Sequence, residues 1–501
     1  MCALYSGVTL PDRPDPENVR KLDIMALPMV NRMQRFGLRI DPAHFAELTD
    51  RLSNRMAELK CDITNEIPTE SLDRFLTAMD AAEGDDEDSE DYVANLDASS
   101  FNVDSSKKMA ELLYDVLGLH LSTKVKIKKT KSGDRLSTGK KTLEQLKRDH
   151  PIVAPVLEYK ECSKLRGTCV SLPRRARFHP AGPDCPCCGR RHYTDEFRAH
   201  TTIMSTRTTS GRLAYKNENL GNIPTRTKLG AEVRAGFIPS VGHVIVQRDW
   251  AQIEMRFLAD KSGDAELIHI FKHNLDPHSM TAVRAFGKTL DEVSKGAGKM
   301  LYRAPCKNVN FGIVYGLTAA GLLDLMALTY ATAGLALPDH INEQWCEEFL
   351  EMWFGLYPSV RQYLDAEESK ALRFGFVWTD AGRVRRIPQA KSALGYVRDA
   401  GVREACNHGI QGKNADTMRL AMGELHDRLR DLDDGGIESY ELISIYDELL
   451  VETEEAHAAT IDAAMEDVME NVLVDKQSGR LLCAVPIKSD GKILTERWVK
   501  E

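Results

Sequence analysis

Two acidic residues, each at the end of a predicted strand, constrain the fold of this chain most strongly. Asp249 follows Val244–Arg248, a short run rich in β-branched residues. Asp447 lies between two further strand candidates, Leu442–Tyr446 and Leu449–Glu452. A strand end holds its side chain rigidly at a sheet edge, and two carboxylates brought together in this way can bridge a pair of divalent ions. Taken alone, an acid at such a position is more often an ordinary strand-terminal residue than a metal ligand. The neighbouring residues must therefore distinguish the two interpretations.

The composition allows a large core but identifies no partner. The chain has 501 residues, 43% of them hydrophobic, which suffices for several domains. It has no apolar run of about 18 residues and no signal-peptide pattern at its start, so we expect a soluble cytoplasmic protein without membrane contact. The 11 Cys are scattered and odd in number, which favours a reducing compartment over a disulfide framework.

The net charge of −9 argues weakly against a nucleic-acid partner, because phosphate contacts need basic patches. The charge is uneven, however. Acidic residues gather between positions 85 and 91, and basic residues gather between positions 124 and 141. The whole-chain charge averages these runs, so it decides nothing about partners.

A third segment carries a regular stripe of cations and aromatic rings. Residues 303–316 read RAPCKNVNFGIVYG, in which four side chains recur at every fourth position: Arg303, Lys307, Phe311 and Tyr315. Each step of four advances an α-helix by about 40° beyond a full turn, so the four side chains share one face. The cations can hold a triphosphate, and the aromatic rings can stack on a sugar and base. An amphipathic core helix with two exposed cations would show the same spacing.

The three segments together resemble family A DNA polymerases, the family of bacterial DNA polymerase I. Residues 249–256, DWAQIEMR, resemble motif A, with Trp250 and Ala251 as departures. Residues 446–452, YDELLVE, resemble motif C, in which Tyr446 replaces the usual His. The stripe at 303–316 resembles motif B, the helix that closes on the nucleotide.

Three further segments carry the same resemblance. Residues 210–224, SGRLAYKNENLGNIP, resemble a family element that contacts the primer–template minor groove. Residues 276–282, DPHSMTA, resemble an element that contacts the nucleotide phosphates, and residues 403–412, REACNHGIQG, place a polar trio on one helical face. Minor-groove acceptors are similar for all correct base pairs, so such polar residues can check geometry without reading sequence.

The resemblance implies a role for each matching residue. Catalytic roles fall to Asp249, Asp447, Glu448 and Lys307. Nucleotide binding falls to Arg303, Lys307, Phe311, Tyr315, His278, Gln252 and Glu254. DNA binding falls to Arg212, Arg226, Arg403, Asn407, Gln411 and Tyr446. Asp249 and Asp447 would bind two Mg²⁺, for which Mn²⁺ can substitute.

Two residues are expected to select the sugar of the incoming nucleotide. Glu254 should lie under the sugar, where a carboxylate crowds a 2′ hydroxyl and favours deoxynucleotides. Phe311 lacks the hydroxyl that Tyr would supply at the 3′ position, so dideoxynucleotides should be poor substrates.

By resemblance, the fold should be α+β with the right-hand architecture of a polymerase: thumb, antiparallel palm sheet and helical fingers. In chain order, the expected regions are an N-terminal arm (1–23), a thumb (24–172) with an acidic insertion (80–98), a first palm segment (173–262) with a Cys-rich loop (179–192), fingers (263–395) and a second palm segment (396–501).

About 23 residues precede the predicted thumb, too few for a proofreading domain. We therefore expect a chain without an intrinsic 3′→5′ exonuclease. Its partners would be primer–template DNA and deoxynucleoside triphosphates, with a separate exonuclease or other replisome proteins. By analogy, a polymerase core of this kind suggests a replication enzyme of a phage or another mobile element. We expect it to be a monomer in the cytoplasm, which is the host cytoplasm for a phage enzyme.

The Cys-rich loop falls outside the family pattern. It reads HPAGPDCPCCGRRH, in which Cys185 and Cys188 have the spacing of half a zinc knuckle and His179 and His192 can complete four ligands. The alternative is a surface loop with reduced thiols, and the sequence alone favours that alternative. A zinc ion here would be structural.

Two other functions stay open. A single-subunit, phage-type RNA polymerase shares the hand-shaped fold, but Gln252-Ile253-Glu254 argues against it. A non-catalytic DNA clamp derived from a polymerase is the second, and the joint presence of Asp249, Asp447, Arg303 and Lys307 argues against it.

Overall fold

The computed structural model describes residues 13–67, 103–122, 127, 129, 135–147, 149–223, 227–332, 335–475 and 477–499. The chain divides into two compact units. Unit 1 comprises Met1–Ile40, Arg175–Ile223 and Phe237–Glu501, and unit 2 comprises Asp41–Arg174 and Pro224–Gly236. The predicted domain boundaries stay predictions.

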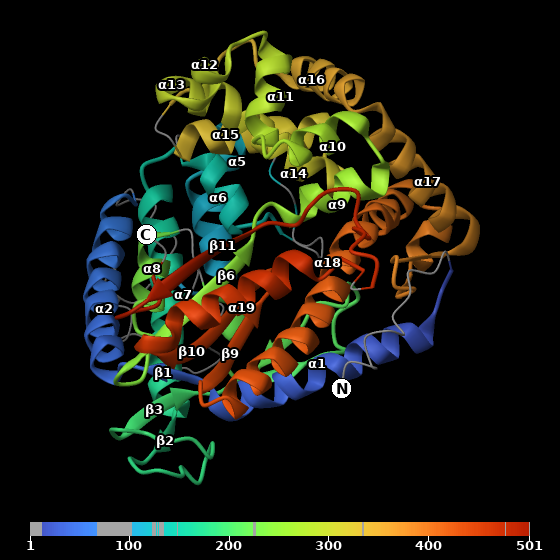
Figure 1. Ribbon diagram of the computed structural model, residues 1–501. Helices are drawn as coiled ribbons and strands as arrows, with labels where there is room; N and C mark the ends of the chain where they lie inside the picture. The colour runs from blue at the N-terminus through green and yellow to red at the C-terminus, as the bar shows by residue number, and fades with distance from the viewer. Residues whose placement is uncertain are drawn as a thin grey trace, which may run out of the picture. The chain divides into compact units, whose positions relative to one another are not determined.

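A four-stranded antiparallel sheet lies at the centre of unit 1 (Figure 1). In sheet order its strands are β11 (Ser489–Leu494), β6 (His243–Trp250), β10 (Glu448–Glu454) and β9 (Ser439–Ile445). The strands predicted before Asp249 and around Asp447 are therefore confirmed. The turn between β9 and β10 is formed by Tyr446 and Asp447, whereas the sequence had suggested Asp447 and Glu448.

The sequence of residues 493–500, ILTERWVK, indicates a last strand, but the structure places that strand earlier. β11 ends at Leu494, and the chain then leaves the sheet. Trp498 is fully buried, and its ring lies 5.6 Å from the ring of Phe237 in an edge-on arrangement. Burial of this indole, and not strand pairing, explains the apolar residues near the C-terminus.

Three helices pack on this sheet: α19 (Ala458–Asn471), α1 (Pro16–Phe36) and α18 (Gly395–Asp434). α19 lies along β6 and β11, where the indole N–H of Trp250 donates to the carbonyl of Met469 at 2.9 Å (Figure 1). α1 lies along β9 and α18. It begins at Pro16, with Asp15 accepting from the N–H of Asn18, so residues 16–23 of the predicted N-terminal arm are helical.

The sequence of residues 251–372 indicates a helix-rich stretch, and the helices there confirm it. Its helices are α9 (Ile253–Ser262), α10 (Ala265–Lys272), α11 (Pro277–Phe286), α12 (Leu290–Ser294), α13 (Gly296–Gly298), the π-helix η6 (Lys299–Arg303), α14 (Ala304–Val314), α15 (Ala319–Thr332), α16 (Glu343–Leu356) and α17 (Pro358–Phe374). α9 and α17 pack against α18, which joins this helical region to the sheet.

Short strands and turns complete unit 1. A three-stranded sheet has the order β1 (Leu38–Ile40), β3 (Glu196–Ala199), β2 (Arg177–His179). Two hairpins pair β4 (Thr202–Met204) with β5 (Ala214–Lys216) and β7 (Phe376–Trp378) with β8 (Val384–Arg386). The 3-10 turns are η5 (Leu220–Asn222), η7 (Pro388–Lys391) and η8 (Glu455–His457).

The Cys-rich loop connects β2 to β3, and its burial corrects the surface-loop interpretation. Cys185 and Cys188 are 3% and 2% exposed, whereas Cys187 is exposed. The two buried sulfurs form a small core with Phe36 and Tyr440, residues that the loop meets only in the folded chain.

Unit 2 is helical. It contains α2 (Pro42–Asn65), α4 (Ser106–Ala110), the π-helix η4 (Glu111–Val116), α5 (Leu119–Ser122), α6 (Lys140–Leu146), most of α7 (Val153–Arg175) and α8 (Lys228–Arg234). Arg55 of α2 pairs with Glu158 of α7 at 2.8 Å. A cavity of about 860 Å³ is lined by both basic and acidic side chains: Arg135, Lys140, Lys147, Lys160 and Lys164, and Glu144, Glu158 and Glu161. The acidic insertion 80–98 lies outside the described residues.

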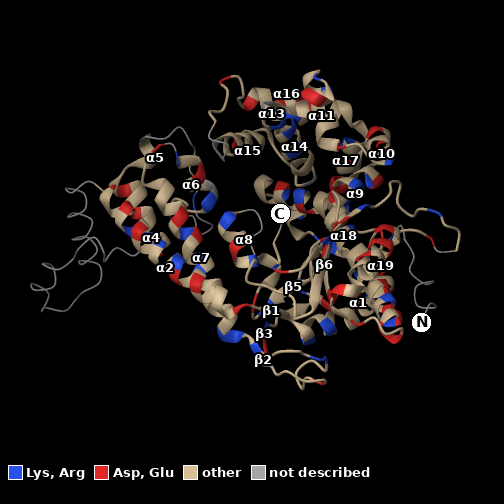
Figure 2. Cartoon of the chain, turned by 60° about the vertical axis from the view of Figure 1, so that its left-hand side comes forward, with Lys and Arg blue, Asp and Glu red and all other residues tan. Residues whose placement is uncertain are grey.

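Figure 2 shows basic and acidic segments interspersed along the helices of both units. Among the described residues, neither unit is wholly acidic or wholly basic.

Candidate active site

The central sheet brings the two predicted carboxylates to the same place. Asp249 is the penultimate residue of β6, and its direct partner across the pairing with β10 is Glu448. The N–H of Trp250 donates to the carbonyl of Asp447 at 3.1 Å. Paired residues of adjacent antiparallel strands lie about 4.5–5.5 Å apart at Cα. The carboxylates of Asp249, Asp447 and Glu448 therefore gather at the same end of these two strands.

Two strained backbone positions flank these carboxylates. Tyr446 has φ 59° and Gln252 has φ 56°, in the left-handed region that residues other than Gly rarely adopt. Tyr446 turns the chain directly before Asp447, and its hydroxyl donates to Asn222 Oδ1 at 2.8 Å. Gln252 turns the chain from β6 into α9. These turns aim Asp447 and the first turn of α9 toward the same edge.

The electrostatics favour a cation beside the pair. Burial and the neighbouring Asp249 carboxylate raise the pKa of Asp447 to about 7. Two carboxylates this close repel each other when both are ionised, and a divalent cation relieves that repulsion.

A further acid lies beside this pair. Asp490 of β11 pairs directly with Asp249 on the side opposite Glu448, and its side chain is exposed. Sequence reasoning missed Asp490 because its position beside Asp249 depends on the pairing register of β11, which no local sequence motif predicts.

The predicted sugar selector Glu254 lies in a polar cluster. Arg212 Nη2 donates to Glu254 Oε1 at 2.8 Å, and the Tyr315 hydroxyl donates to Glu254 Oε2 at 2.9 Å. Gln411 Nε2 in turn donates to the Tyr315 hydroxyl at 2.9 Å. Four segments far apart in the sequence therefore meet here.

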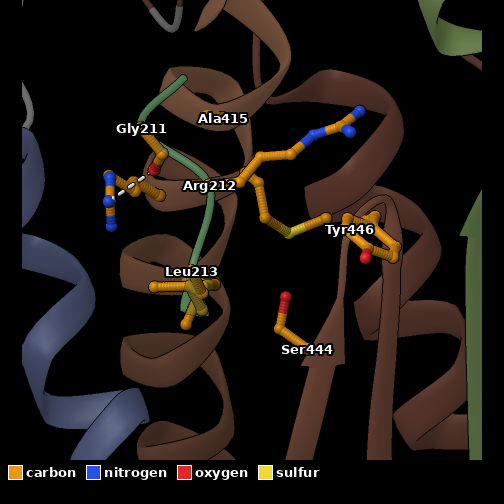
Figure 3. Close-up of a pocket in the computed structure, with 9 residues that line it drawn as sticks. Gly211, Arg212, Leu213, Ala415, Ser444 and Tyr446 are labelled. Atoms are coloured by element: carbon orange, nitrogen blue, oxygen red, sulfur yellow. Dashed lines mark hydrogen bonds between the residues drawn. The ribbon is translucent and has the colours of Figure 1, made fainter. Parts of the chain in front are cut away.

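Hydrogen bonds from Arg419 of α18 hold the loop that carries Arg212. Figure 3 shows the Arg212 side chain extending toward Tyr446, and the guanidinium carbon lies 5.1 Å from the centre of that ring. The buried Arg419 donates to the carbonyl of Gly211 at 2.6 Å, drawn as a dashed line, and to that of Ser205 at 2.5 Å. A cavity of about 20 Å³, the size of one water, lies between this loop and α18. Sequence reasoning missed Arg419, which lies in none of the quoted motifs.

Arg303, the first cation of the stripe, is held by an acid. Arg303 Nε lies 2.8 Å from Asp276 Oδ2, and Nη2 lies 3.2 Å from Oδ1, which makes a two-pronged contact. Asp276 also caps α11 by accepting from the N–H of Ser279. Although burial acts to raise it, the pKa of Asp276 is lowered to about 2, chiefly by Arg303. Lys307, one turn along the helix, is exposed.

His278 has a defined tautomer. The indole N–H of Trp353 can only donate, and it donates to Asn310 Oδ1 at 2.7 Å. The amide group of Asn310 must therefore face His278 Nδ1, which lies 3.0 Å away, and donate to it. The ring proton then sits on Nε2. Burial lowers the pKa of His278 to about 4, so the ring is neutral near pH 7.

The His278 side chain is only 2% exposed, and its ring centre lies 5.3 Å from that of Phe311. A phosphate contact by His278 would therefore use the Nε2–H edge.

The predicted minor-groove trio lies on α18. Arg403 is exposed, and Asn407 and Gln411 are half-buried. Gly316, which follows the stripe with φ 68°, lies against this helix, because a Cβ there would clash with Arg403 Cγ. Arg226 lies outside the described residues.

Comparison with known proteins decides the family. The sequence pattern of DNA polymerase family A matches residues 76–499. The chain belongs to DNA polymerase family A. The family expected from the motifs is thereby confirmed.

Individual family A members agree with this assignment. The thermostable DNA polymerase I of Thermus aquaticus is 34% identical over 440 residues, which cover 88% of this chain and 44% of that protein. DNA polymerase I of Deinococcus radiodurans is 34% identical over 387 residues, which cover 77% of this chain and 36% of that protein. The chain thus spans less than half the length of these relatives.

A solved structure confirms the α+β right-hand polymerase fold. The polymerase domain of Pol1 from M. smegmatis, in complex with a DNA primer-template and dNTP, matches with a TM-score of 0.72 and 25% identity. The match covers 94% of this chain and 69% of that one. Among the helices in the described residues of the chain, none is both long enough and apolar enough to span a bilayer.

Proposed function

We propose that this chain is a DNA-directed DNA polymerase that adds deoxynucleotides to the 3′ end of a primer. The observation that carries the proposal is the pairing of β6 with β10, which brings Asp249, Asp447 and Glu448 together at one end of the two inner strands. The names of the family A relatives, and the DNA primer-template and dNTP bound by the M. smegmatis domain, support it.

In the reaction, the primer 3′ oxygen attacks the α-phosphorus of the nucleotide. One phosphorus–oxygen bond forms, the bond to the β-phosphate oxygen breaks, and pyrophosphate leaves with the proton of the hydroxyl transferred to solvent. Asp249 and Asp447 would hold two Mg²⁺ or Mn²⁺ ions, which activate the 3′ hydroxyl and neutralise charge on the leaving group. The raised pKa of Asp447 fits a site built to accept positive charge.

The stripe, which runs from Arg303 at the end of η6 through α14 to its C-cap Tyr315, would bind the triphosphate. Arg303 is pre-oriented by Asp276, and the exposed Lys307 can contact phosphate oxygens and donate toward the leaving group. His278 offers its Nε2–H to the same oxygens. Phe311 and Tyr315 would stack on the sugar and base, while Gln252 lies at the turn into α9.

Glu254 would lie under the sugar, held in place by Arg212 and Tyr315. Arg212, Arg403, Asn407, Gln411 and Tyr446 would line the primer–template, with the minor-groove contacts independent of base sequence. Arg226 stays a predicted DNA contact.

Primer extension with the purified chain tests the proposal. We expect template-directed extension with deoxynucleotides that requires Mg²⁺ or Mn²⁺ and stops in EDTA. Preference for ribonucleotides would instead indicate an RNA polymerase, and DNA binding without extension would indicate a clamp.

The predicted lack of proofreading needs a separate assay. A labelled primer with a mismatched 3′ end, incubated with the chain and Mg²⁺ but without nucleotides, should keep its length. Shortening from the 3′ end would contradict the prediction. Phage origin, a separate exonuclease partner and a monomeric state also remain predictions.

A further inference from the structure

Four metal-binding side chains converge in the core of the Cys-rich loop, away from the proposed reaction. His179, Cys185, Cys188 and His192 are each 3% exposed or less. Each offers one ligand atom, and these atoms all lie within 4.8 Å of one another. The His179 Nδ1 and Cys185 Sγ atoms are 3.4 Å apart, and the His192 Nε2 and Cys188 Sγ atoms are 3.1 Å apart. Four ligands around a tetrahedral Zn²⁺ lie about 3.3–3.8 Å from one another, so little movement would complete the site.

The backbone is arranged as a tight knuckle around the two cysteines. Cys185 N–H donates to the Arg190 carbonyl at 3.0 Å, and Gly189 N–H donates to the Cys185 carbonyl at 2.6 Å. Gly189 has φ 74°, and a Cβ there would meet the Arg35 guanidinium at 2.6 Å. The turn thus orients both sulfurs inward.

Neighbouring groups direct the lone pair of His192 toward the sulfurs. Its Nδ1 lies 3.1 Å from Glu196 Oε2, in an ion-pair contact. The negative charge of that carboxylate favours the tautomer with the ring proton on Nδ1, which leaves the lone pair on Nε2 facing Cys188. A carboxylate behind a His ligand is the common outer partner of protein zinc sites.

The lone pair of His179 is directed in the same way, through a second histidine. His200 Nδ1 lies 2.9 Å from the Gln34 carbonyl, which can only accept, so His200 carries its proton on Nδ1. His200 Nε2 is then an acceptor, and His179 Nε2, 3.1 Å away, must donate to it. The lone pair of His179 is thus left on Nδ1, facing Cys185.

We propose that this cluster binds one structural Zn²⁺ through His179 Nδ1, Cys185 Sγ, Cys188 Sγ and His192 Nε2. Binding releases one proton from each thiol, so the site of two thiolates, two neutral imidazoles and Zn²⁺ carries no net charge. A neutral site suits full burial. Two sulfur and two nitrogen ligands in a closed tetrahedron favour Zn²⁺ over Mg²⁺, which prefers oxygen ligands.

The ion would fasten the β2–β3 hairpin to the central sheet. Arg190, which follows the knuckle, pairs with Glu452 of β10 at 2.7 Å and stacks on Tyr440 of β9 at 3.6 Å. Arg198 of β3 contacts the same Glu452 at 3.3 Å. Glu452 lies five positions along the chain from Asp447, about 16 Å on an extended strand, so the ion would act on stability and not on catalysis.

Zinc analysis of the full-length chain, purified with reductant and without chelator, tests the proposal on the unaltered protein. We expect one Zn²⁺ per chain, and X-ray absorption should show two sulfur neighbours at about 2.3 Å and two nitrogen neighbours at about 2.0–2.1 Å. A chain without zinc, or with zinc bound only by nitrogen and oxygen, overturns the proposal. So does a native mass lacking two hydrogens, which would indicate a Cys185–Cys188 disulfide.

Paired cysteine variants locate the site. Cys185→Ser should lose the zinc and lower the Tm by about 5 °C or more. Cys187→Ser, the exposed neighbour, should keep both the zinc and the Tm. If Cys185→Ser does not fold, removal of zinc from the wild-type chain by a zinc-selective chelator should give the same fall in Tm, with Mg²⁺-dependent primer extension retained at low temperature. Equal zinc loss in both variants, or chelation without a change in Tm, contradicts the proposal.

Discussion

The Tyr315 hydroxyl donates a hydrogen bond to Glu254 Oε2 at 2.9 Å, linking the end of the α14 stripe to the acid that follows Asp249 in the chain. The two residues lie far apart in the sequence. Their contact joins the proposed nucleotide-stacking ring to the proposed sugar selector, so each fixes the position of the other.

Removal of the Glu254 carboxylate should relax sugar selection. In Glu254→Ala the 2′ hydroxyl of a ribonucleotide no longer meets a carboxylate, so the ribo/deoxy ratio of kcat/KM should rise about tenfold or more, about 1.4 kcal/mol. Single-nucleotide primer extension measures this ratio. Glu347→Ala, an exposed acid on α16, is the matched control and should leave the ratio unchanged. An unchanged ratio in Glu254→Ala would remove Glu254 as the selector.

A single added hydroxyl should change the use of dideoxynucleotides. Phe311→Tyr supplies a hydroxyl where a dideoxynucleotide lacks its own, and the dideoxy/deoxy ratio should rise about tenfold or more. Competitive chain termination on one template provides the measurement. The ratio in wild type should be low, and equal ratios in the two proteins would refute the role of Phe311.

The indole of Trp353 should stabilise the fold through Asn310. In Trp353→Phe the buried Asn310 Oδ1 loses its indole donor at 2.7 Å and keeps only the Thr281 hydroxyl at 3.4 Å, which costs about 1–3 kcal/mol and lowers the Tm by several degrees. Trp345→Phe on the same helix is the control, because that indole stacks on Phe349 with ring centres 4.9 Å apart. Thermal unfolding should show the larger fall for Trp353→Phe, and the reverse order would contradict the hydrogen-bond chain.

His278 should contribute to acid sensitivity. Burial lowers its pKa to about 4 in the folded chain, whereas the unfolded chain has the ordinary value near 6.5. Between these values the unfolded state binds the extra proton, so stability falls as pH falls from about 6.5 to 4, by about 3 kcal/mol at most from this residue. In His278→Gln the loss of Tm between pH 7.5 and 5 should be smaller than in wild type. An identical loss would show that His278 does not titrate in this way.

Local patterns predicted most of the central sheet. The β-branched runs before Asp249 and around Asp447 became β6, β9 and β10, because strand formation there follows from residue type over a few positions. The last strand was predicted too close to the C-terminus. The apolar Trp498 belongs to the core, where it packs against Phe237, and not to a strand.

Sequence motifs predicted the residues of the proposed site, but not the residues that hold them in position. Asp276 behind Arg303, and Arg419 beneath Gly211, are contacts between residues far apart in the sequence, and neither pair leaves a periodic signal. In the Cys-rich loop, one feature could be predicted from the sequence and another could not. Its spacing indicated a metal site, while its burial depends on Phe36 and Tyr440, which the loop meets only after folding.

The most direct test of the two-metal proposal compares Asp447→Asn with wild type in two assays on the same primer–template. Asn has the shape of Asp but not its charge, so metal binding should fail while the DNA-binding surface stays intact. We predict that extension with Mg²⁺ falls by at least about a thousandfold and that the Kd for primer–template changes less than about threefold. Extension close to the wild-type rate in Asp447→Asn would contradict the account.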